Sequence, residues 1–104
     1  MNEKFIAVIG AGVIGSDVAL DLSIHNYRVL LKDLSSRVLE KALDKIKKSY
    51  RFTKMMKNTE PPPLDEILTR IKTTTDYAEF KKVDFVINIP MEISNGKEYP
   101  VLHQ

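Results

Sequence analysis

The feature that most constrains the fold is a glycine pattern directly behind an apolar run near the start of the chain. Residues 5–9 read Phe-Ile-Ala-Val-Ile, and glycines follow at positions 10, 12 and 15 in Gly-x-Gly-x-x-Gly spacing. A second apolar run covers residues 29–31, and Asp33 stands just beyond it. A strand that turns through this spacing into a helix, followed by a strand with an acid at its end, is the fingerprint of a dinucleotide-binding βαβ unit.

Each residue of the pattern has a physical role. Gly10 lets the chain turn sharply off the strand, Gly12 lets the backbone approach a pyrophosphate, and Gly15 lets the helix pack close to the sheet. Asp33 would accept hydrogen bonds from the adenosine ribose hydroxyls, which selects against a 2′-phosphate. A glycine turn that binds nothing is the alternative, and the complete motif context argues against it. We therefore predict that NAD is the cofactor, bound by Gly10, Ala11, Gly12, Val13, Ile14, Gly15 and Asp33.

The remaining pattern alternates strands and helices. Strands are expected at 4–9, 28–32, 70–74 and 83–89, and helices at 13–23, from 35 or 36 to about 55, and at 64–69. This order predicts an α/β, Rossmann-like fold with a mainly parallel sheet in the order 3-2-1-4 and helices on both faces. The strand expected at 83–89 contains a continuous apolar run at 85–87, which is typical of a strand buried on both faces.

A complete dinucleotide fold has about six strands. We therefore expect a Rossmann-type domain at residues 1–92 that is truncated after its fourth strand, and an irregular tail at residues 93–104, where Asn95-Gly96 and Pro100 interrupt any pattern. The exposed edge of the fourth strand would then need a cover, because native sheets protect hydrophobic edges. Self-association or a completing partner chain would supply it.

Composition excludes several classes of function. The chain has no cysteine, which excludes disulfides, cysteine zinc sites and thiol nucleophiles and is compatible with the cytoplasm. No apolar stretch is long enough to span a membrane. His25 is expected to cap a helix or lie on the surface, and His103 falls in the unpatterned tail without a partner acid. We assign neither histidine to catalysis, and their spacing predicts no metal site.

The charge is unevenly distributed although the net charge is only +2. Residues 35–59 contain eight lysines and arginines against two acids. A basic helix attracts anionic partners, although a solvated helix face is the plainer interpretation. The low total charge argues against nucleic acid as the partner.

Longer stretches of the sequence resemble the start of 3-hydroxyacyl-CoA dehydrogenases. The similar residues are 8–16, 19, 27–29, 31–33, 39–48, 70–76 and 83–87, so the resemblance covers about residues 4–92. Related dehydrogenases that act on hydroxyacyl groups held by acyl carrier proteins in polyketide pathways look equally similar. The resemblance implies an NAD-dependent oxidation of a 3-hydroxyacyl thioester, or the reverse reduction.

The resemblance also implies roles for single residues. Glu92 aligns with a family glutamate near the nicotinamide. The basic helix lies in the region where the family contacts coenzyme A, and an acyl carrier protein is the other candidate partner. Contacts with acyl-CoA or with the carrier protein are therefore expected from Lys41, Lys45, Lys48 and Lys54. The family's proton-transferring histidine and its glutamate partner follow the fourth strand. We therefore assign no catalytic residue and do not expect turnover by this chain alone. A non-catalytic module that binds a nucleotide or a partner, and a structural subunit completed at its fourth strand, stay open as alternatives.

Two residues beside the glycines have open roles. Asp17 departs from the small or neutral residue usual in the family, and its charge would favour the helix dipole but oppose the phosphates. Ser16 is expected either to contact a phosphate or to stand as an ordinary helix-start serine. Asn88 replaces a glutamate that is typical of the family after the fourth strand.

Overall fold

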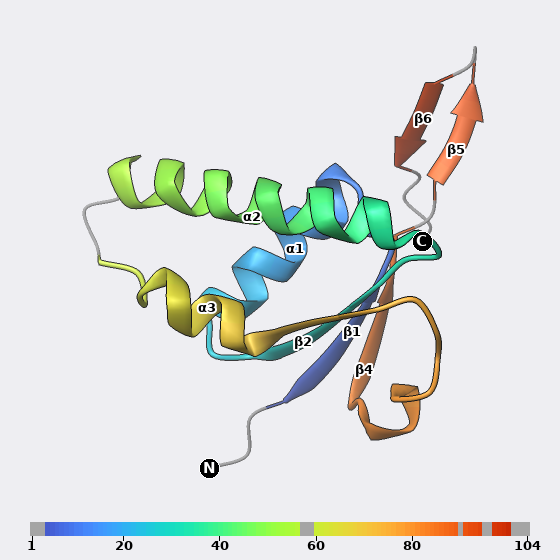
Figure 1. Cartoon of the computed structure of the whole chain (residues 1–104), viewed down its shortest axis with the longest axis horizontal. Helices are drawn as coiled ribbons and strands as arrows, with labels where there is room; N and C mark the ends of the chain where they lie inside the picture. The colour runs from blue at the N-terminus through green and yellow to red at the C-terminus, as the bar shows by residue number, and fades with distance from the viewer. Residues whose placement is uncertain (1–3, 57–59, 90, 95–96, 101–104) are drawn as a thin grey trace.

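The computed structural model describes residues 4–56, 60–89, 91–94 and 97–100. The chain alternates strands and helices through most of its length (Figure 1). In chain order the elements are β1 (Phe5–Ile9), α1 (Val13–Ile24), β2 (Arg28–Lys32), α2 (Ser36–Met56), α3 (Leu64–Arg70), β3 (Ile71–Thr74), the 3₁₀ turn η1 (Phe80–Lys82), β4 (Phe85–Asn88), β5 (Met91–Ser94) and β6 (Lys97–Pro100).

The first four strands form one parallel sheet in the order β3-β2-β1-β4, which confirms the predicted topology. In the register Val8 of β1 lies between Leu31 of β2 and Ile87 of β4. The connection from α1 to β2 turns at Asn26, whose φ of 71° is the left-handed conformation expected of an asparagine that ends a helix.

The core lies on one face of the sheet. Because side chains alternate along a strand, Val8, Val29 and Leu31 point to the same side. Residues of α1, α2 and α3 cover them, including Leu20, Ile46 and Ile67, all of which are buried. Figure 1 shows these three helices together above the sheet. Among the described residues, the other face is covered by the segment around η1 (residues 75–84). This segment contributes a 3₁₀ turn and no α-helix, so the three α-helices do not divide between the two faces as predicted.

The second face is closed by aromatic side chains. Phe5, Ala7 and Leu30 are buried there against Phe80 and Val83. Lys32 belongs to the same face and is only 2% exposed, with its Nζ 4.1 Å from the centre of the Tyr77 ring. A buried ammonium is costly without a partner, and this cation–π contact offsets part of that cost.

Two expectations for the last third of the chain are wrong. β4 is not buried on both faces: Phe85 is 59% and Val86 is 51% exposed. The physical reason is its position, because β4 pairs with β1 on one side and is the last strand of its sheet. In place of an irregular tail from residue 93, β5 and β6 pair as an antiparallel two-stranded sheet, in which Glu92 lies opposite Tyr99. Among the described residues, no helix has the length and apolar character needed to cross a membrane.

Candidate cofactor site

The glycine loop leaves β1 at the carboxyl end of the sheet. Gly10 has a φ of +106°, a conformation that side chains strongly disfavour. Its N–H donates to the carbonyl of Lys32 at 2.8 Å, which ties the start of the loop to the end of β2. A Cβ at this position would also lie 3.2 Å from the carbonyl oxygen of Ile89. The turn therefore needs glycine at position 10.

The other two glycines differ sharply in their surroundings. A Cβ on Gly15 would lie 1.7 Å from the carbonyl oxygen of Gly10, so α1 approaches the loop only because that atom is absent. A Cβ on Gly12 would meet no atom within 4 Å. The protein itself places no steric demand on Gly12, and the space above it is open to a ligand.

Gly12 is also the N-cap of α1, and no side chain caps the helix. The first N–H groups of a helix have no intrahelical partner, and with the helix dipole they attract anions. The Ser16 hydroxyl is buried and donates to the carbonyl of Gly12 at 2.6 Å. Of the two roles open for Ser16, this geometry supports the structural one.

Asp33 follows β2 and holds the loop from the other side. Its Oδ2 accepts a hydrogen bond from the Ala11 N–H at 3.0 Å, and its Oδ1 accepts one from the Ser35 N–H at 3.2 Å. Each carboxylate oxygen can accept more than one hydrogen bond, so this partly buried group keeps capacity for ribose hydroxyls. The contact with Ala11 was not apparent from the sequence, which pointed to Asp33 only as a ribose acceptor.

These features fit a dinucleotide. The open space above Gly12 and the uncapped helix suit a pyrophosphate, and the fixed carboxylate of Asp33 suits a ribose. Val13 and Ile14, in the first turn of α1, are exposed beside that space. Asp17 does not present an unpaired charge, because its Oδ1 lies 2.7 Å from the Nζ of Lys45. This ion pair lessens the opposition to phosphates that the sequence suggested.

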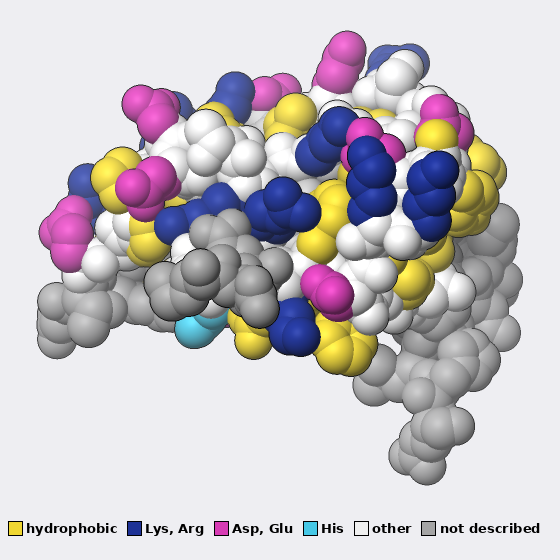
Figure 2. Space-filling view, turned by 90° about the horizontal axis from the view of Figure 1, so that it is seen from below, with side chains coloured by type: hydrophobic (Ala, Val, Ile, Leu, Met, Phe, Trp, Pro, Cys, Tyr) yellow, Lys and Arg dark blue, Asp and Glu magenta, His cyan; other side chains and the backbone are white. Residues whose placement is uncertain are grey.

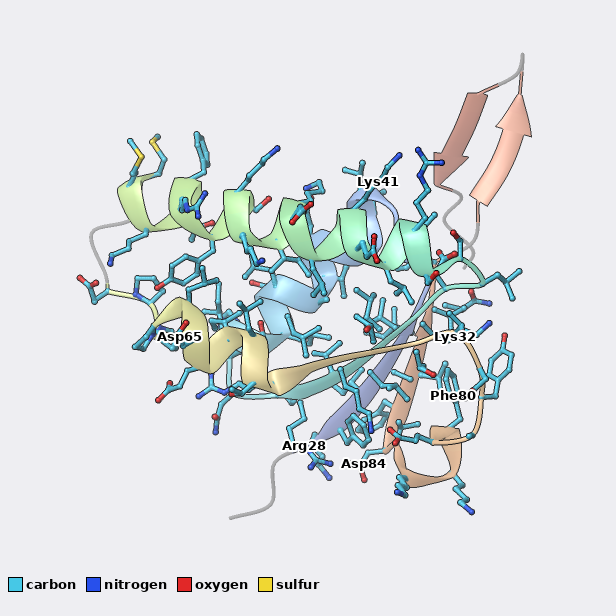
Figure 3. All side chains as sticks on the ribbon, viewed as in Figure 1. Arg28, Lys32, Lys41, Asp65, Phe80 and Asp84 are labelled. Carbon is cyan, nitrogen blue, oxygen red and sulfur yellow. The ribbon has the colours of Figure 1, made fainter. Side chains whose placement is uncertain are left out.

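The four lysines named for partner contacts fall into two groups. Lys45 pairs with Asp17 at 2.7 Å, and the Nζ of Lys54 lies 3.4 Å from Glu60. Lys41 and Lys48 are exposed on α2 and have no ion pair within the described part of the chain. Figure 3 shows Lys41 on the side of α2 that faces away from the sheet.

The structure brings no general base to the glycine loop within the residues it describes. His25 caps α1 at the opposite end of the sheet, with its Nδ1 2.7 Å from the carbonyl oxygen of Asp21. His103 lies outside the described residues, as does the side chain of Glu92 in β5. No group of three or more His, Asp or Glu residues in the described part is placed to hold a metal ion.

Comparison with known proteins identifies this architecture. The family model "3-hydroxyacyl-CoA dehydrogenase, NAD binding domain" matches residues 5–99. The fatty acid oxidation complex subunit alpha of Acinetobacter baumannii is 34% identical over 94 residues, which are 88% of this chain and 13% of that protein. The glyoxysomal fatty acid beta-oxidation multifunctional protein MFP-a of Cucumis sativus is 28% identical over 89 residues, or 86% of this chain and 12% of that protein.

Solved structures agree with the family match. The (S)-3-hydroxybutyryl-CoA dehydrogenase of Ralstonia eutropha superposes with a TM-score of 0.76 at 27% identity, over 90% of this chain and 33% of that one. The 3-hydroxybutyryl-CoA dehydrogenase of Escherichia coli gives a TM-score of 0.73 at 28% identity, over 85% and 19% of the two chains. The chain thus spans a third or less of these relatives. It belongs to the family of 3-hydroxyacyl-CoA dehydrogenase NAD-binding domains, and its cofactor is NAD.

Proposed function

We propose that this chain is the cofactor-binding part of an oxidoreductase that interconverts 3-hydroxyacyl and 3-oxoacyl thioesters. The observation that carries the proposal is the open space above Gly12, bounded by an uncapped helix and by the fixed carboxylate of Asp33. The names of the relatives supply the substrate class. NAD, when bound, accepts or donates the hydride in such a reaction.

The chain's own residues would bind and orient the cofactor. In this proposal the backbone N–H groups at Gly12, Val13 and Ile14 donate to the pyrophosphate, and Asp33 accepts from the adenosine ribose. Gly10 and Gly15 shape the loop, and Ala11 links it to Asp33. Glu92 is proposed to lie near the nicotinamide, on the strength of the family resemblance alone.

The test is a calorimetric titration with NAD and with NADP. The chain should bind NAD in preference to NADP. The Gly12→Val variant should lose NAD binding while it keeps its circular dichroism spectrum and urea midpoint, because the added side chain enters open space. If Gly12→Val binds NAD as tightly as the parent chain, the pyrophosphate does not lie above this loop and the site assignment is wrong.

A completing partner is the second part of the proposal. Phe85 and Val86 of β4 are exposed, and so are Val13 (64%) and Ile14 at the start of α1. We propose that a further protein segment or a partner chain covers this edge and supplies the base that removes the hydroxyl proton. Light scattering after size-exclusion chromatography tests self-association as the cover: a dimer supports a second copy in this role, and a monomer excludes it.

The thioester carrier would contact the basic surface of α2. The exposed Lys41 and Lys48 suit the phosphates of coenzyme A or an acidic carrier protein. Binding of coenzyme A should weaken in a Lys41→Glu, Lys48→Glu double variant. A Lys4→Glu, Lys81→Glu variant makes the same change of charge at two exposed positions away from α2 and serves as the control. Equal loss in both variants would indicate attraction by overall charge and not a docking site.

A non-catalytic nucleotide-binding module is the alternative function. It is favoured by the position of His25, which caps α1 and leaves the glycine loop without a base among the described residues. An assay of acetoacetyl-CoA reduction that follows NADH absorbance separates the two proposals. Turnover that appears only when the catalytic half of a relative is added supports the oxidoreductase, and retained NAD binding without turnover supports the module.

The cytoplasm is the proposed compartment, because a chain without cysteine needs no oxidising environment to fold. Plant relatives are named glyoxysomal or peroxisomal. Fractionation with markers for the cytoplasm and the peroxisome decides between the two.

A further inference from the structure

A second hollow lies at the amino end of the sheet, opposite the glycine loop. It has a volume of about 250 Å³ and is lined where β1, β2 and β3 begin, together with the end of α3 and the segment around η1. The lining residues are Phe5, Arg28, Val29, Thr69, Arg70, Lys72, Glu79 and Lys82. Four cations therefore face one carboxylate. Seen from below, Lys and Arg side chains gather on this side of the molecule (Figure 2).

Two of the four cations are already engaged. Arg70 donates to the carbonyl of Ser23 at 2.7 Å and approaches Glu66 at 3.4 Å. Lys72 forms a hydrogen-bonded ion pair with Glu79, and this contact, reinforced by the charge of Lys82, lowers the pKa of the Glu79 carboxyl. Glu79 is thus ionised at neutral pH and forms an ion pair with Lys72.

Arg28 and Lys82 are exposed and form no ion pair within the described residues. The guanidinium carbon of Arg28 lies 4.4 Å from the centre of the Phe5 ring. Stacking of this kind restricts a guanidinium while leaving its N–H groups free, and a pre-ordered guanidinium matches the geometry of a phosphate. The carboxylate of Asp84 is held against β1, because its Oδ2 accepts the Phe5 N–H at 2.9 Å.

We propose that this amino-end pocket binds the phosphate groups of a small polyanion. Arg28 and Lys82 make the direct contacts, Lys72 adds a third cation by exchanging Glu79 for the ligand, and Arg70 shapes the wall. The volume accommodates a pyrophosphate-sized group. The pocket is separate from the cofactor site, which lies at the carboxyl end of the same strands. Figure 3 shows Arg28 at the lower end of β2, on the opposite side of the molecule from Lys41 of α2.

Inorganic pyrophosphate, titrated by calorimetry into the whole chain, is the probe. Arg28→Gln and Lys82→Ala should each weaken its binding at least fivefold. Glu79→Gln should strengthen binding severalfold, because it removes the competing carboxylate and releases Lys72. Circular dichroism checks that each variant keeps its fold, and Lys82→Ala provides the test even if Arg28→Gln disturbs Phe5.

Two control variants distinguish this pocket from other cationic surfaces. Lys81→Ala removes a charge from the same turn outside the pocket lining, and Lys41→Ala removes one from α2. Because the glycine loop also suits a pyrophosphate, every titration uses the Gly12→Val background, in which that loop is blocked. Both controls should then bind pyrophosphate within twofold of Gly12→Val alone. The proposal is overturned if Gly12→Val does not bind pyrophosphate, if adding Lys41→Ala abolishes binding, or if Lys81→Ala weakens binding as much as Lys82→Ala.

Discussion

The two ends of the parallel sheet offer anions two different kinds of surface. At the carboxyl end the glycine loop presents backbone N–H groups and a single carboxylate, and no cationic side chain is needed to define the site. At the amino end the pocket presents side-chain cations around an aromatic ring. The backbone surface depends on the absence of atoms at Gly12 and Gly15, whereas the side-chain surface depends on charge.

This difference predicts different responses to change. A backbone site is fixed by the fold, so a substitution there acts through steric conflict and either unfolds the chain or blocks the ligand. Side chains at the amino-end pocket can be replaced one at a time, because Arg28, Lys72 and Lys82 are exposed. Salt should affect that end more, since exposed charges are screened by ions in the solvent.

The largest expected effect is on stability at the carboxyl end. Gly15→Ala should lower the free energy of unfolding by about 3 kcal/mol or more, because the new Cβ would meet the Gly10 carbonyl oxygen and the backbone must move. Gly12→Ala should change it by less than about 1 kcal/mol, since its Cβ meets nothing. Urea midpoints at a common slope measure both. Equal midpoints for the two variants would mean that the close approach of α1 is not required.

Asp33 should give the next largest effect. Asp33→Asn should weaken NAD binding about tenfold, the loss expected when a charge-assisted hydrogen bond becomes a neutral one, and should reduce the preference for NAD over NADP. Asp17→Asn is the matched control: it removes a carboxylate from α1 that Lys45 already pairs, so NAD affinity should stay within twofold. A larger loss of NAD affinity in Asp17→Asn than in Asp33→Asn would mean that the carboxylate that governs NAD binding is Asp17 of α1 and not Asp33.

The sequence predicted the carboxyl end better than the amino end, and the reason is physical. The loop residues are contiguous from Gly10 to Gly15, and the second strand brings Asp33 to them in any right-handed βαβ unit. The amino-end pocket draws its cations from Arg28, Arg70, Lys72 and Lys82, which meet only because of the strand register and the path of the segment around η1. No local pattern encodes that meeting.

The same distinction explains the error at β4. The segment from Val83 to Ile89 has the mainly apolar composition of a central strand. Composition does not report where in the sheet a strand lies or what covers it. Burial on both faces depends on the helices or loops that cover the sheet, and at its edge that cover leaves Phe85 and Val86 exposed. The contact between Asp33 and Ala11 was not predicted for a similar reason. It joins two loops, and the sequence pattern already assigns each loop a role without any contact between them.

Added salt should lower ligand affinity more at the amino end of the sheet than at the carboxyl end, and this difference should be smaller than the effects of the substitutions above. Between about 50 and 300 mM KCl, pyrophosphate affinity at the amino end should fall about tenfold, because its exposed cations are screened by the added ions. NAD affinity should fall by only about twofold over this range, since short hydrogen bonds from backbone N–H groups are less sensitive to ionic strength. Calorimetric titrations of each ligand at four salt concentrations measure the two slopes. Parallel slopes would contradict the distinction between a backbone site and a charged one.

The smallest effect is the pH dependence that Glu79 adds at the amino end. Its ion pair with Lys72 lowers the pKa of the folded carboxyl below the ordinary glutamate value of about 4.3. A lowered folded pKa means that the folded state binds the proton less readily than the unfolded state, so the stabilisation is present above pH about 4.3 and is lost as the pH falls through the lower folded value.

Urea unfolding of the parent chain and of Glu79→Gln between pH 7 and 3 should therefore show a gap that is constant near neutrality and closes in acid. Asp65→Asn, at an exposed position on α3, corrects for the loss of one negative charge. A gap that persists at the acid end would mean that Glu79 stabilises the segment around η1 by contact and not by charge. The amino-end pocket would then be held in shape by the packing of that segment, and Lys72 would be less free to leave Glu79 for a phosphate.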